Sequence, residues 1–141
     1  MDQDGGYLKP MMDITPYNSH SDWAWLPGIA WGADGKALFI TTHSSAPAPI
    51  TAEESPFFDI TATSFENKAT VPLVKDTGMF AYPASSPMRP SGDEKIYQVA
   101  YLQAITSTQI DTSRYRLVVM DRDGSNRRVI FPPADSGGIE P

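Results

Sequence analysis

Short apolar runs alternate with polar turns and prolines along most of this chain. Residues 23–31 form an apolar, aromatic run, and residues 37–42 form a second, with Asp34-Gly35 between them. Asp-Gly between two apolar runs is a strong hairpin signal, because both residues tolerate the positive φ of a tight turn. The pattern therefore predicts two antiparallel strands joined at Asp34-Gly35.

Two further strands are predicted in the first half of the chain. Residues 57–63 alternate large apolar side chains with small or polar ones, as a half-buried strand does. A turn at Asn67-Lys68 separates them from residues 70–74, where Pro72 indicates an edge strand, because proline cannot donate to a ladder. The first half of the chain thus gives four strands.

The same order of turns and strands then repeats. Strands are predicted at residues 95–102, 115–121 and 127–131, with turns at 91–93 and 122–126. Gly35 and Gly92, like Leu73 and Ile130, are 57 positions apart (92 − 35 and 130 − 73). A fixed period that carries four strand-like segments is typical of a β-propeller blade, although this period exceeds the usual length of about 40–50 residues. Long loops after the second strand of each unit account for the excess.

We therefore divide the chain into a lead-in and two blades. The lead-in covers residues 1–22, the first blade residues 23–83 and the second blade residues 84–141. Residues 7–14 of the lead-in are expected to hold a short strand of a preceding blade. The predicted fold is all-β, with four-stranded antiparallel blades and an incomplete ring.

Two segments resemble the repeats of TolB-like β-propellers. Residues 31–39 read Trp-Gly-Ala-Asp-Gly-Lys-Ala-Leu-Phe, which is similar to the Trp-Ser-Pro-Asp-Gly-Lys turn and following strand of that family. Residues 117–126 end in Asp-Arg-Asp-Gly-Ser-Asn and match the family's later Asp-x-Asp-Gly-Ser-Asn turn more closely. The departures are Gly32-Ala33 in place of Ser-Pro, and Met88 in place of the second tryptophan. Together the matches cover roughly residues 27–141, and such repeat motifs bear on fold more than on function.

Two blades cannot close a ring of the six or so that such propellers usually have. A blade without neighbours leaves part of its sheet bare, which is a liability for uncontrolled pairing. The sequence thus predicts that these blades belong to a longer propeller or that several chains complete the ring by homo-oligomerising. We favour the longer propeller.

Composition narrows the classes of partner. The chain has a formal net charge of −6 and no long basic run, which argues against nucleic-acid binding. No apolar run approaches the roughly 20 residues of a membrane-spanning helix. Cysteine is absent, so disulfides and thiolate metal sites are excluded, and the acidic N-terminus does not resemble a signal peptide.

No catalytic, cofactor-binding or metal-binding residues are predicted. His20 and His43 lie 23 positions apart and have no metal-ligand spacing. Residues 121–132 lack the glycine at position six and the glutamate at position twelve of an EF-hand loop, so we interpret their start as a turn. No Gly-x-Ser-x-Gly nucleophile elbow occurs, and the paired acids at Glu53-Glu54 are interpreted as solvated surface.

Aromatic and arginine side chains are the candidates for a partner surface. Trp31 is expected to pack between blades, whereas Trp23 and Trp25 lie where an axial surface would be and could stack on a sugar or a peptide. Core packing is the favoured alternative for both. Arg122 begins the last turn and Arg127 and Arg128 follow it, and these arginines either form a solvated hairpin or offer a site for an anion or a partner.

The resemblance implies a binding role. TolB-like propellers commonly serve as protein-binding platforms in the bacterial envelope, so we expect a non-catalytic segment that binds a protein, peptide or glycan in the periplasm or outside the cell. The alternative is part of the propeller of an enzyme, either a prolyl-oligopeptidase-like serine peptidase or a propeller sugar lyase.

Overall fold

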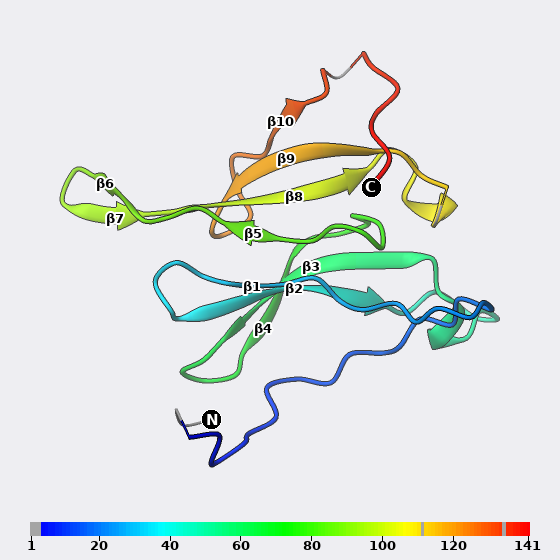
Figure 1. Ribbon diagram of the computed structural model, residues 1–141, viewed down its shortest axis with the longest axis horizontal. Coiled ribbons are helices and arrows are strands. Elements are labelled where there is room, and N and C mark those ends of the chain that lie inside the picture. The colour runs from blue at the N-terminus through cyan, green and yellow to red at the C-terminus, as the bar shows by residue number, and fades with distance from the viewer. Residues whose placement is uncertain (1–3, 111, 134) are drawn as a thin grey trace.

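The computed structural model describes residues 4–110, 112–133 and 135–141, and it is an all-β structure (Figure 1). The strands are β1 (Ile29–Trp31), β2 (Ala37–Ser44), β3 (Phe57–Ser64), β4 (Thr70–Val74), β5 (Ala84–Ser85), β6 (Arg89–Ser91), β7 (Glu94–Ile96), β8 (Gln98–Ala104), β9 (Tyr115–Asp121) and β10 (Arg128–Phe131). Two single-turn 3-10 helices, η1 (Ala52–Glu54) and η2 (Ser107–Gln109), lie in loops. The first three residues of the predicted lead-in fall outside the described residues.

Two four-stranded antiparallel sheets make up the body of the structure. The first has the order β1-β2-β3-β4 and the second the order β10-β9-β8-β5. Figure 1 shows the second sheet above the first, with the β6-β7 hairpin extending beyond the sheets. The predictions of an all-β fold, of four-stranded antiparallel sheets and of a ring left unclosed are confirmed.

Three of the turns lie where glycine permits a left-handed backbone. Gly35, Gly92 and Gly124 have φ of +69°, +60° and +84°. The Gly35 amide donates to the carbonyl of Gly32 at 2.8 Å, and the Gly124 amide donates to the carbonyl of Asp121 at 2.9 Å. These are the turns that the sequence predicts, because glycine populates positive φ without a Cβ penalty.

The N-terminal segment is not a strand, contrary to the expectation for residues 7–14. It runs along the side of the first sheet that faces away from the second sheet (Figure 1). The Lys68 ammonium donates to the carbonyl of Pro10 at 3.1 Å, and the Thr63 hydroxyl donates to the sulfur of Met12 at 3.7 Å. Pro10 interrupts any regular ladder here, so side-chain contacts position this segment.

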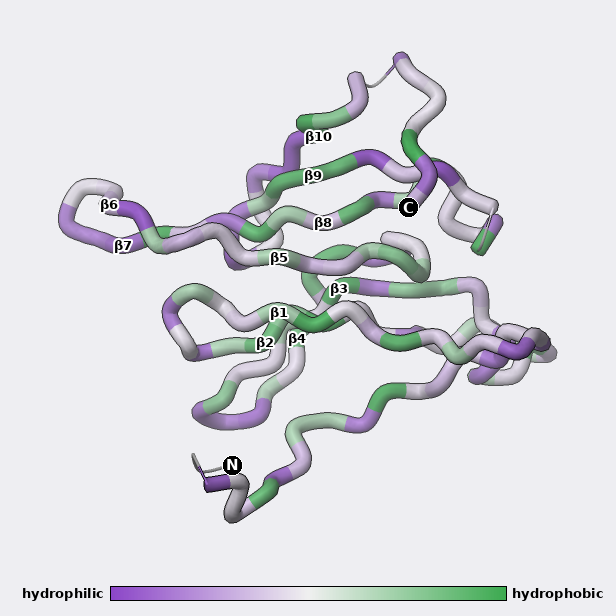
Figure 2. Tube along the Cα trace, in the orientation of Figure 1, coloured by the Kyte–Doolittle hydropathy of each residue, from purple (hydrophilic) through white to green (hydrophobic). Residues whose placement is uncertain are grey.

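The main core lies between the two sheets. Phe39 and Ile60 of the first sheet are 1% and 0% exposed, and they pack in one cluster with side chains of the second sheet. Those partners are Tyr97, Val99, Tyr101, Val118 and Met120. Successive side chains of a strand point to opposite faces, so the intervening residues of each strand face outward. Figure 2 shows the resulting apolar positions along β9 and at the end of β10.

Candidate interaction surface

The two tryptophans proposed as a ligand surface lie in different environments. Trp25 is 7% exposed, and its indole N–H donates to the carbonyl of Met79 at 2.9 Å. Its ring packs edge-on against Phe58 and His43 at the end of β2. Trp25 is therefore a core residue and is not available to a ligand, whereas Trp23 is 42% exposed beside Tyr17.

Trp31 was expected to be covered between blades, and in this chain it is not. Its side chain is 64% exposed, and its ring stacks on Phe65 at 4.6 Å with an interplanar angle of 18°. The register explains this position. Trp31 pairs with Leu38, which points away from the second sheet, while the neighbouring Phe39 points toward it. Trp31 thus lies on the outer face of the first sheet.

Arg122 and Arg127 connect the two sheets. A guanidinium N–H of Arg122 donates to the carboxylate of Asp34 at 3.4 Å, and the guanidinium lies 6.0 Å from the ring centre of Tyr97. Arg127 donates to the carbonyl of Leu73 at 3.0 Å and to that of Gly124 at 2.8 Å. These contacts join the β9-β10 turn to the first sheet, so both arginines have a structural role.

The hydroxyl of Tyr97 completes this contact between the sheets. It donates to the Asp34 carboxylate at 3.3 Å. Burial raises the pKa of Tyr97 to about 12, with the negative charge of Asp34 and this hydrogen bond acting in the same direction and Arg122 opposing them. Burial also raises the pKa of Tyr101 and of Tyr115. The protonated phenol is therefore the form that the folded state prefers.

Alkaline pH is expected to destabilise the fold through these tyrosines. An unfolded tyrosine ionises near its ordinary pKa of 10.0, whereas folded Tyr97 keeps its proton up to about 12. The free energy of unfolding is therefore insensitive to this group below pH 10 and falls as the pH rises from 10 toward 12. Denaturant titrations followed by circular dichroism at several alkaline pH values measure this slope. Tyr97→Phe should reduce the slope, and an unchanged slope would contradict the assignment.

Arg128 lies on a different surface, the outer face of the second sheet. It pairs with Val119, which pairs with Ala100, which in turn pairs with Ala84. These residues face away from the first sheet, because the alternate residues Val99 and Val118 are in the core. A hollow of about 260 Å³ opens here, and its lining is Ala84, Ser85, Ser86, Gln98, Ala100, Val119 and Arg128.

The side chains around this hollow form a continuous apolar face. Leu102 pairs with Leu117, and Leu117 pairs with Phe131, which is 54% exposed. We call the outward-facing set the open face. It consists of Ala84, Ala100, Leu102, Leu117, Val119 and Phe131, with Arg128 at the β10 edge.

The open face of the second sheet corresponds to the core-forming face of the first sheet, as the paired residues of the two sheets show. In the first sheet, one row of paired residues across the four strands is Ala30, Phe39, Ala62 and Val71. In the second sheet, the corresponding row is Ala84, Ala100, Val119 and Arg128. In the first sheet, Phe39 of this row is buried against the second sheet, Ala62 packs beside it, and Val71 at the β4 edge is exposed. Among the described residues, no strand packs on the corresponding row of the second sheet.

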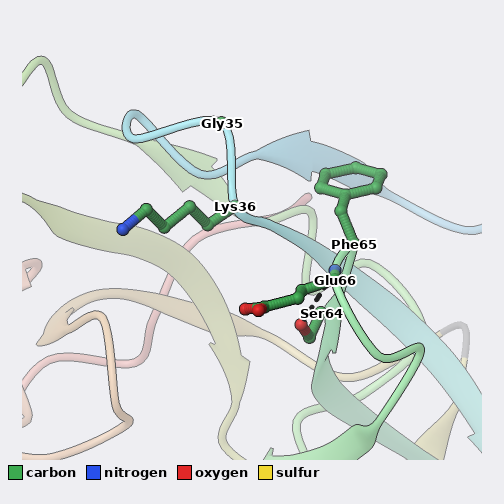
Figure 3. Close-up of a pocket in the computed structure, with 5 residues that line it drawn as sticks. All are labelled: Gly35, Lys36, Ser64, Phe65 and Glu66. Carbon is green, nitrogen blue, oxygen red and sulfur yellow. Dashed lines mark hydrogen bonds between the residues drawn. The ribbon is translucent and has the colours of Figure 1, made fainter.

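The outer face of the first sheet is covered only in part. Thr63 is fully buried beneath Met12 of the N-terminal segment. Near the β1-β2 turn the face is open at Trp31, and a hollow of about 300 Å³ lies between Gly35, Lys36, Ser64, Phe65 and Glu66. In Figure 3, Lys36 and Glu66 extend toward one side of this hollow, and the ring of Phe65 projects away from them.

The five residues proposed from the sequence do not form one site. Trp25 lies at the end of β2, next to His43, whereas Arg122 contacts Asp34, just before β2 begins. The open face was missed, although strand alternation at 98–104 and 115–121 carries the signal. Which alternate set faces outward is decided by the packing of Tyr101 and Met120 against the first sheet, and a single strand does not reveal it.

The described residues hold no group of three or more His, Cys, Asp or Glu side chains that could bind a metal ion. No helix in the described part of the chain is long and apolar enough to cross a membrane.

Comparisons of the chain with protein-family models, with curated proteins and with solved structures gave no match.

Proposed function

We propose that this chain is a non-catalytic, protein-binding β-module built from propeller-like sheets, and that it binds its partner through the open face of the second sheet. The observation that carries this proposal is the difference between the two outer faces. The N-terminal segment lies on part of the outer face of the first sheet. The outer face of the second sheet leaves Phe131 54% exposed and Leu117 and Val119 partly exposed. A continuous exposed apolar face of this kind marks an interaction site in a folded protein.

The chemistry of the open face favours another β-sheet as the partner. The face is four strands wide and apolar at its centre, which suits packing of one sheet on another about 10 Å away. The second sheet already receives one sheet on its opposite face in this manner, through Tyr97, Val99 and Tyr101. Arg128 at the rim adds a positive charge that an acidic group on the partner would meet.

Arrays of immobilised proteins, peptides and glycans test this function. We expect the chain to bind a protein ligand and Ala100→Arg to abolish that binding, because the arginine would project from the centre of the open face. Ser91→Arg adds the same charge on the exposed β6-β7 hairpin and should bind as the wild type does. Binding that survives Ala100→Arg, or binding of glycans alone, would contradict the proposal.

A further inference from the structure

We propose that the partner of the open face is a second copy of this chain, which inserts Trp31 of its first sheet, held in place by stacking on Phe65, into the hollow of the second sheet. This inference rests on the proposed function, because it names the occupant of the same face. The contact is head-to-tail, since it joins two different surfaces, the outer face of one sheet and the outer face of the other.

The inserted group is present on the first sheet. The Trp31 and Phe65 rings are stacked, and together they form a preordered aromatic knob beside the exposed Ile29 side chain. The side chain of Trp31 points away from the core, so it projects into solvent from the outer face of the first sheet. Large exposed aromatic rings with fixed geometry are the residues that most often anchor protein interfaces.

The receiving hollow has the shape that such a knob needs. Its floor consists of the short side chains of Ala84, Ala100 and Val119, and its volume is about 260 Å³. The larger Leu117 and Phe131 side chains lie on the same face, at the next paired positions of β9 and β10. An apolar hollow with bulky residues beside it accepts one large aromatic side chain and excludes water around it.

Electrostatic complementarity supports a second copy in particular. Residues 114–131 contain five arginines and two aspartates and so have a net charge of +3. Because the whole chain has a net charge of −6, the remaining residues together carry −9. Glu66 follows Phe65 directly and lines the adjacent hollow together with Lys36, while Arg128 borders the hollow that would receive Trp31. The contact therefore brings the acidic part of one copy toward the arginine-rich segment of the other, whereas a face-to-face contact between two open faces would bring the two arginine-rich segments together.

Light scattering after size exclusion measures the association directly. We expect the wild type to exceed its monomer mass of 15.4 kDa and to grow in mass with concentration, because a head-to-tail contact either closes a ring or continues. Trp31→Glu removes the knob and Ala100→Arg blocks the hollow. Each variant alone should associate about thirtyfold more weakly or more, as expected when an interface anchor is lost. Both positions are solvent-accessible, and unchanged circular dichroism spectra would show that both variants fold.

Mixing the two variants separates the alternatives. Trp31→Glu keeps an intact hollow and Ala100→Arg keeps an intact knob, so an equimolar mixture should form a one-to-one dimer that neither variant forms alone. A wild type that stays monomeric at every concentration, or a mixture that fails to form the dimer, overturns this inference. If the monomer still binds another protein in a manner that Ala100→Arg abolishes, the proposed function stands and only the identity of the partner is wrong.

Discussion

Phe39→Ala is expected to destabilise the protein by about 3–5 kcal/mol, the usual cost of truncating a buried phenylalanine. Phe39 is 1% exposed and lies at the centre of the contact between the sheets, where its ring meets that of Tyr97 at 6.2 Å. Because folded domains are typically stable by only about 5–15 kcal/mol, this variant should unfold at a much lower denaturant concentration. Urea denaturation followed by circular dichroism measures the change.

Trp31→Ala is the matched control for this variant. Trp31 is also a large aromatic residue of the first sheet, but it lies on the opposite face and is 64% exposed. Measured at a concentration where the chain is monomeric, its removal should change the stability by less than about 1 kcal/mol, because little buried area is lost. Equal losses for Phe39→Ala and Trp31→Ala would mean that the two sheets do not pack through Phe39.

Gly78→Ala is expected to cost about 2–5 kcal/mol. Gly78 has a φ of +86°, which a residue with a Cβ adopts at a cost of about 1–2 kcal/mol. A Cβ at this position would lie 2.6 Å from the Cβ of Ala104 and 2.8 Å from the hydroxyl oxygen of Tyr115, and overpacking of this kind adds about 1–3 kcal/mol. The backbone must shift, because the obstacles belong to a packed strand and a buried ring.

Gly35→Ala separates the backbone cost from the packing cost. Gly35 has a similar φ of +69°, but no atom lies within 4 Å of an added Cβ. The stability of this control should therefore fall only by the cost of the left-handed backbone, about 1–2 kcal/mol. Thermal and urea denaturation of both variants give the comparison, and equal losses would show that the segment around Gly78 is not packed against β8 and β9.

Local sequence patterns predicted most strands well, because each strand has its own alternation and its own turn. β4 and β9 occupy the predicted residues, and β3 extends one residue further, to Ser64. The aromatic run before Trp31 was predicted as one long strand, but β1 begins only at Ile29. Pro27 explains part of this difference, because it has no amide hydrogen to donate to a ladder, and the last bond on this side is from the Thr41 amide to the Gly28 carbonyl at 2.9 Å.

The second unit departs from the first in a way that local patterns do not reveal. One strand was expected over residues 95–102, but β7 ends at Ile96 and β8 begins at Gln98. The first of these strands pairs with β6 in a separate hairpin, while the second enters the sheet between β5 and β9. Both segments have suitable β residues, so the choice of partner strand depends on contacts distant in the chain.

The residues of the candidate surface were harder to predict than the strands, because their exposure depends on tertiary packing. Sequence reasoning chose Trp25, which the structure buries, and Arg122 and Arg127, which connect the sheets. Arg128 alone of the three arginines borders the open face. A tryptophan or arginine in the sequence can be assigned to a binding surface only when the direction of its side chain is known. That direction depends on which side of the sheet packs against a second sheet.

Thiol labelling tests directly whether the outer faces of the two sheets differ in their exposure to solvent. The chain contains no cysteine, so a single introduced thiol reports one position. In the Trp31→Glu background, measured at a concentration where the chain is monomeric, Ala100→Cys lies on the open face and Thr63→Cys lies beneath the N-terminal segment. We predict rapid labelling of the thiol at position 100 and slow labelling at position 63. Equal rates at the two positions would show that the second sheet does not leave a more open outer face than the first.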